Sequence, residues 1–147
     1  MALQFNEYLK GENGLASYLF VSAGFLWGSS TNACRIYIYP STIALPSTCA
    51  NSDVIPAGYI LTYTLGTTSA MAIRNDAVSL GSSLTANTTA AGTLSWVFCS
   101  GSITTSLGAF ITDSIGLTGA SKLFTFSTLT PTSGQAVTLS NINIKFI

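Results

Sequence analysis

The sequence predicts an all-β protein, a jelly-roll-like β-sandwich of about eight strands with a short N-terminal helical segment. Short segments of alternating apolar and polar residues recur roughly every 8–12 residues, with Gly, Pro, Ser and Thr between them, as in sandwiches and barrels. The strongest segment, residues 92–101, places Leu94, Trp96 and Phe98 on one face and has glycine at both ends. The length of 147 residues suits a single domain with a substantial core.

Charged residues are scarce in this chain. They make up 7% of it and the net charge is zero, whereas about 25% is ordinary for globular domains. A surface made of Ser, Thr, Asn and Gly without net charge favours association with copies or partners. The same neutrality gives no attraction to nucleic acid or to anionic membranes, so neither is an expected partner.

Catalytic and metal-binding chemistry has little support in the sequence. Histidine, the commonest general base and metal ligand, is absent. Cys34, Cys49 and Cys99 lack the close spacing of a metal site and are expected to be small buried hydrophobes. Asp53 and Asp113 could form a glycosidase-like pair, but no spacing argument brings them together. We therefore expect no catalytic, cofactor-binding or metal-binding residues and predict that the protein is not an enzyme.

The N-terminal region, residues 1–30, is predicted to be a helical arm ahead of a sandwich domain at 31–147. Apolar residues at helical spacing indicate two short helices, at 2–10 and 15–23. The apolar run around the second helix continues to Trp27 and is shorter than the about 20 residues that span a bilayer. It is interpreted as a helix buried at the base of the domain or at an interface.

The first half of the sandwich begins with a strongly alternating strand at 35–39 that stops at Pro40. A long connection rich in Pro, Ser and Thr follows at 41–58, and loops of this length usually contact something. The next strand is expected at 59–65. Shorter strands are expected at 69–74 and 77–80, and the segment 84–89 is open between a strand and a loop.

The second half continues from 92–101 with a strand at 109–115 that carries Ile111, Asp113 and Ile115 on one face. A strand at 123–127 and a turn at 130–134 come next. In the last strand, 135–147, the apolar residues change parity at Ser140-Asn141. A one-residue shift would otherwise turn the apolar face outward, so this change predicts a β-bulge.

The tyrosines at 37, 39, 59 and 63 lie on predicted strands and leave three roles open. They could belong to the core, to a protein interface, or to a surface that stacks on sugars. Arg35 begins an apolar strand in a chain with few charges, so we expect it to pair with a carboxylate or to lie at an interface.

The order of several segments resembles that of small Ser/Thr/Gly-rich virion structural proteins of tailed bacteriophages. The strand that opens with Arg35-Ile36-Tyr37, the Ala91-Gly92-Thr93 approach to Trp96, and the late strand at 133–139 recur there in this order. The resemblance covers residues 30–147. This chain departs from the pattern at Ile38-Tyr39-Pro40, where the family has a Gly/Thr turn.

The resemblance implies a non-enzymatic capsid decoration (cement) protein that binds the major capsid protein and is located in the virion after assembly in the host cytoplasm. A homo-oligomer, most simply a trimer, is expected. The alternatives are a tail, neck or fibre component, and a carbohydrate-binding adhesin module. Residues 2–27 and 41–58 are the expected contact segments. The candidate interface residues are Leu3, Phe5, Tyr8, Leu15, Tyr18, Leu19, Phe25, Trp27, Arg35, Ile43 and Leu45.

Overall fold

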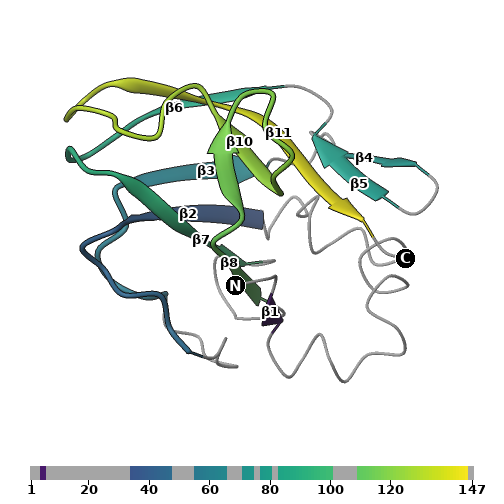
Figure 1. Ribbon diagram of the computed structural model, residues 1–147, viewed down its shortest axis with the longest axis horizontal. Coiled ribbons are helices and arrows are strands. Elements are labelled where there is room, and N and C mark those ends of the chain that lie inside the picture. The colour runs from purple at the N-terminus through teal and green to yellow at the C-terminus, as the bar shows by residue number, and fades with distance from the viewer. Residues whose placement is uncertain are drawn as a thin grey trace.

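The computed structural model describes residues 4–5, 34–47, 55–65, 71–74, 77–80, 83–100 and 109–145. This part of the chain is all-β, with eleven strands in two facing sheets and no helix (Figure 1). The all-β, sandwich-like prediction is confirmed. The jelly-roll connectivity and the division into arm and domain stay predictions.

The first sheet has five strands in the order β1-β8-β7-β2-β3, and every neighbouring pair is antiparallel. The segment predicted to be most apolar, β7, lies at its centre. The strands are β1 (Gln4–Phe5), β2 (Cys34–Pro40), β3 (Leu61–Leu65), β7 (Leu94–Ser100) and β8 (Ala109–Thr112).

The second sheet has six strands arranged around the long strand β11. β6 and β5 pair with different stretches of β11, β10 pairs with it antiparallel, and β9 joins β10 in parallel. The hairpin of β4 and β5 extends to the right of the sandwich in Figure 1. The strands are β4 (Met71–Arg74), β5 (Ala77–Leu80), β6 (Leu84–Asn87), β9 (Ile115–Leu117), β10 (Phe124–Phe126) and β11 (Ala136–Lys145).

The core between the sheets is formed by one face of each. The Tyr63 ring lies 6.4 Å from that of Phe126, and the Tyr63 hydroxyl donates to the Val137 carbonyl at 2.7 Å, so these residues join the two layers. The register places Ile36 opposite Tyr63 and therefore on the same face. The buried residues of this inner core are Ile36, Ile38, Leu61, Tyr63, Val97, Cys99, Phe124, Phe126, Val137, Leu139 and Ile142.

The β-bulge predicted in the last strand is confirmed. Thr125 pairs with Asn141 and Phe126 with Leu139, so Ser140 is the extra residue. The bulge restores the apolar face, because Leu139 and then Ile142 are buried. The Ser140 hydroxyl donates to the Thr125 carbonyl at 3.0 Å, which gives the bulged residue a local partner.

Two expectations about secondary structure are wrong. The helix expected at 2–10 is contradicted at Gln4–Phe5, which pair with Ile111 and Phe110 of β8 and so satisfy its edge. The strand expected at 109–115 is broken into β8 and β9, which belong to different sheets. The Ile115 amide donates to the Asp113 carbonyl in a tight turn at the break. The helix expected at 15–23 lies outside the described residues.

Candidate interaction surface

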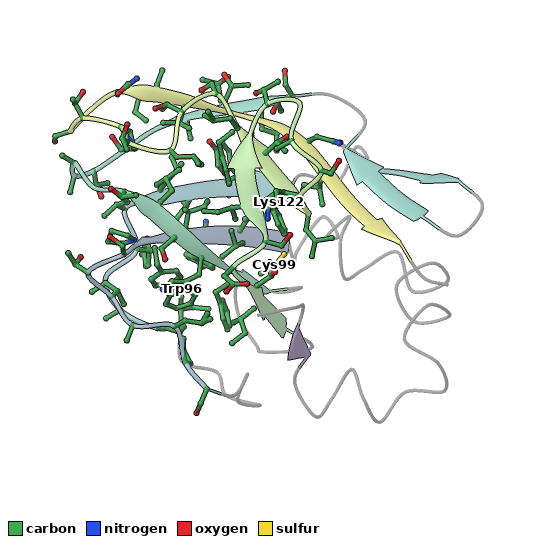
Figure 2. All side chains as sticks on the ribbon, viewed as in Figure 1. Trp96, Cys99 and Lys122 are labelled. Carbon is green, nitrogen blue, oxygen red and sulfur yellow. The ribbon has the colours of Figure 1, made fainter. Side chains whose placement is uncertain are left out.

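The outer face of the first sheet, which points away from the second sheet, carries an aromatic cluster. The register places Tyr37 opposite Phe98 and Tyr39 opposite Trp96, and Ile111 lies beside Phe98 on β8. All five side chains are buried and form one cluster. In Figure 2, Trp96 lies on the side of β7 that faces away from the second sheet. The central strands β2 and β7 of the first sheet are therefore buried on both faces.

The rings in this outer cluster make close, specific contacts. Tyr39 and Trp96 are stacked almost parallel, with centroids 3.8 Å apart and an angle of 5° between the planes. Tyr59 meets the edge of the cluster, 4.9 Å from Tyr37 and 6.1 Å from Tyr39 in T-shaped arrangements. Stacked and T-shaped aromatic pairs add to the stabilisation that burial itself provides.

Two stretches of the long connection cover this cluster, 41–47 and 55–60, which we call the strap. Ile43, Leu45 and Ile55 of the strap pack against the aromatic side chains. The Trp96 Nε1–H group donates to the Ile43 carbonyl at 2.8 Å, and the Tyr39 hydroxyl donates to the Pro56 carbonyl at 2.7 Å. Each half of the strap is thus anchored by an aromatic side chain beneath it.

The ends of the strap are attached to the sheet backbone. The Ser41 amide donates to the Thr93 carbonyl at 2.9 Å, and the Ile60 amide donates to the Ile38 carbonyl at 3.0 Å. Gly58 has a φ of 97°, and a Cβ there would lie 2.8 Å from Ile43 Cδ1. Glycine at this position therefore provides both the left-handed backbone and the space that the strap needs.

The buried phenols are held in their neutral form. Burial, and secondarily the neighbouring Tyr37 and Tyr59, raise the pKa of Tyr39 well above its ordinary value. Burial alone raises the pKa of Tyr63 in the inner core in the same direction. Both hydroxyls act as hydrogen-bond donors to backbone carbonyls, a role that requires the protonated form.

The predicted interface residues are only partly described. Ile43 and Leu45 are half-buried in the strap, so they cover their own sheet. Arg35 is half-buried on the outer face of β2, opposite Thr64 and Ser100, and Phe5 lies in β1. The other predicted interface residues lie outside the described residues: Leu3, Tyr8, Leu15, Tyr18, Leu19, Phe25 and Trp27.

The four tyrosines divide into two groups. Tyr37, Tyr39 and Tyr63 are at most 5% exposed, so they belong to the core and offer no ring face to a sugar. Tyr59 is 42% exposed and is the member of the cluster that reaches the surface. Burial of three tyrosines counts against the carbohydrate-binding alternative, which requires exposed coplanar rings.

The outer cluster and its cover were not predicted from the sequence. The sequence of β7 contains an indication of this second buried face. Trp96 and the residues two positions away on either side occupy one face of the strand, and the other face, which would be polar in a half-exposed strand, carries the apolar residues Val97 and Cys99. Apolar residues on both faces are typical of a strand that is buried on both sides. Both side chains are at most 1% exposed in the inner core, which confirms the expected burial of Cys99.

The exposed surface is nearly uncharged. Among the residues whose exposure the structure defines, Lys122 is the only charged one that is exposed, and Arg35 and Asp113 are half-buried. Most of the exposed residues are Ser, Thr, Gly or Ala. Asp53, which was considered as a catalytic pair with Asp113 although no spacing argument joins them, lies outside the described residues.

The described residues contain no group of three or more Cys, Asp or Glu side chains that could hold a metal ion. Nor does this part of the chain include a helix with the length and apolar character that a bilayer crossing requires. Comparisons with protein-family models, with curated proteins and with solved structures give no match.

Proposed function

We propose that the chain is a non-enzymatic structural subunit of a tailed-bacteriophage virion, and specifically a capsid decoration protein. In this proposal a jelly-roll-like, homo-oligomeric sandwich binds the major capsid shell and adds buried area that resists internal pressure. The proposal follows the resemblance of residues 30–147 to small virion proteins.

The observation that carries this proposal is the nearly uncharged surface, on which Lys122 is the only exposed charge where exposure is defined. A free protein with this surface and zero net charge associates readily. In a permanent assembly the same surface is favourable, because the centres of protein interfaces are depleted in charged residues. An assembled subunit therefore fits the surface better than a freely diffusing protein does.

The strap adds a second argument. It covers the aromatic cluster with Ile43, Leu45 and Ile55 and fixes two backbone carbonyls on buried side chains. The described part of the connection therefore packs on its own domain, and the Tyr59 side chain is its exposed aromatic feature. A domain that covers both faces of its central strands with its own residues suits a mechanical role.

The copy number of the chain in purified particles tests this proposal. Quantitative mass spectrometry of particles, with the major shell protein as internal standard, should give hundreds of copies for a decoration protein. A handful of copies would indicate a tail, neck or fibre subunit. Absence of the chain from purified particles would overturn the virion assignment altogether.

Particles that lack the chain provide the functional arm of the test. Shells without a decoration protein should assemble normally but release their DNA at a lower temperature, and added full-length chain should restore the original release temperature. Unchanged release temperature would contradict a stabilising role. A version that lacks residues 1–27 should fail to restore it if that segment makes the contact, provided that its circular dichroism shows a folded domain after the loss of β1.

A further inference from the structure

Strand β3 forms one edge of the first sheet and, within the described part of the chain, has no strand paired on its other side. It pairs with β2 through five consecutive residues without a bulge. It contains neither proline nor charge. Edge strands with free backbone groups pair with other chains unless charge, proline, bulges or a cover prevent it. Among the described residues, β3 therefore presents a side to which a partner strand can add, and the segment after β6 reaches only the residue before β3, where the Thr89 amide donates to the Ile60 carbonyl at 2.9 Å.

The opposite side of the sandwich is different. There the edge strand β9 has only three residues, and a turn with Gly119 at a φ of 93° leads from it to the exposed Lys122. The edge of β8 in the other layer is covered by β1. A short strand, a lysine and a covering segment protect that side, whereas β3 itself contains neither a charged residue nor a proline.

The sequence of β3 indicates its partner, because Leu61-Thr62-Tyr63-Thr64-Leu65 reads the same in both directions. Two copies that pair antiparallel about a two-fold axis at Tyr63 would place Thr62 opposite the partner's Thr64. Every residue of β3 would then lie opposite a residue of the same type in the partner strand. We propose that β3 pairs with β3 of a second copy of this chain, joining two first sheets into one continuous sheet.

The faces of β3 agree with this arrangement. Tyr63 is buried on the inner face, whereas Thr64 is exposed on the outer face and Thr62 is half-buried beside it. Cross-strand threonine pairs are favourable in antiparallel sheets. In the other layer, β6 lies against β3 and is also uncharged. Neither layer therefore places like charges together at the two-fold contact.

This inference deepens the homo-oligomeric part of the proposed function and rests on it. A two-fold contact of this type is isologous and generates dimers, or assemblies with an even number of subunits when another contact is added. A trimer built by a different contact would become a hexamer. The pairing concerns the isolated chain, so its failure would leave the copy number in particles unaffected and the two proposals can fail separately.

Sedimentation of the full chain is the first test. The parent should have the mass of a dimer or of an even multiple. Thr64→Lys introduces two lysines beside the axis and should shift the mass to that of the half-assembly, with unchanged circular dichroism. Ser121→Lys adds the same charge to the exposed β9–β10 connection and should leave the mass unchanged. A monomeric or odd-numbered parent, or equal behaviour of the two variants, would overturn the pairing.

Disulfide trapping tests the register. Thr62→Cys and Thr64→Cys chains, one of them enlarged by a tag, should form a mixed disulfide dimer when they are combined and oxidised. Either variant alone should not cross-link through its new cysteine, because the two equivalent positions are diagonal rather than opposite. The parent, with its three native cysteines, is the control. Absence of the mixed dimer, or equal cross-linking of the single variants, would overturn the proposed register.

Discussion

The central strands of the first sheet, β2 and β7, are buried on both faces, but by different means. On the inner face, side chains such as Ile36 and Val97 pack against a second sheet. On the outer face, an aromatic cluster around Trp96 is covered by the strap, which is two stretches of irregular chain. One face thus has a regular sheet opposite it, and the other has a segment with few hydrogen bonds of its own.

This difference explains the residue types on the two faces. A regular sheet satisfies most of its own backbone, so aliphatic side chains are sufficient over much of the inner face, where Tyr63 adds a donor to the Val137 carbonyl. An irregular cover presents backbone carbonyls that need donors, and buried carbonyls without a donor are costly. Trp96 and Tyr39 combine a large apolar ring with a polar donor, and both donate to strap carbonyls. Because the strap contacts only the outer face, we expect that it can be released without separating the sheets.

The largest expected effect comes from truncating one aromatic side chain on each face. Trp96→Ala and Phe126→Ala should each lower the free energy of unfolding by about 3–5 kcal/mol, because each removes a fully buried ring. Denaturant titration followed by circular dichroism measures both losses. Trp96→Ala alone should also free the strap, since it removes the donor to the Ile43 carbonyl.

Limited proteolysis under native conditions distinguishes local release of the strap on the outer face from unfolding of the whole domain. Trp96→Ala should be cleaved between residues 41 and 60 at a rate that does not depend on global stability. Phe126→Ala should be cleaved only as fast as the whole domain unfolds. Equal strap cleavage in both variants would show that the strap and the inner core form one cooperative unit, contrary to the comparison.

A smaller effect is expected when one hydroxyl is removed from each face. Tyr63→Phe deletes a fully buried donor to the Val137 carbonyl and should cost about 1–3 kcal/mol. Tyr39→Phe deletes a partly buried donor to Pro56 and should cost about 0.5–1.5 kcal/mol, because water can replace it more easily. Denaturant titration of both variants provides the measurement. A larger cost for Tyr39→Phe would mean that the strap stabilises the domain more than its burial indicates.

Much of the strand layout could be predicted from the sequence, because alternation of apolar residues depends only on which face of a strand is buried. The strand at 77–80 was placed with its observed bounds, and the parity change at Ser140 gave the bulge correctly. These features are local. They depend on neighbours one or two residues apart, which the sequence displays directly.

The assignment of strands to sheets and the cover of the outer cluster depend on contacts between residues that are far apart in the chain, so they could not be predicted in this way. Ile111 and Ile115 share a parity, but the turn at Asp113 sends them to different sheets. Nothing local indicates that Ile43 would cover Trp96, because these two residues are 53 positions apart in the chain. Of the predicted interface, Ile43 and Leu45 are now accounted for by packing within the chain.

The smallest expected effect is a loss of stability at alkaline pH, to which one buried tyrosine on each face contributes. Tyr39 and Tyr63 have a raised pKa in the folded protein, whereas in the unfolded chain they ionise near pH 10. Above that pH the unfolded chain loses protons that the folded protein keeps, so stability is fully present below pH 10 and falls as the pH rises. Each tyrosine should cost about 1 kcal/mol at pH 11, measured by denaturant titration at pH 8 and pH 11. Tyr39→Phe and Tyr63→Phe should each remove about half of the stability that is lost between pH 8 and pH 11. If both variants lose as much stability as the parent does, neither phenol is the source of the loss.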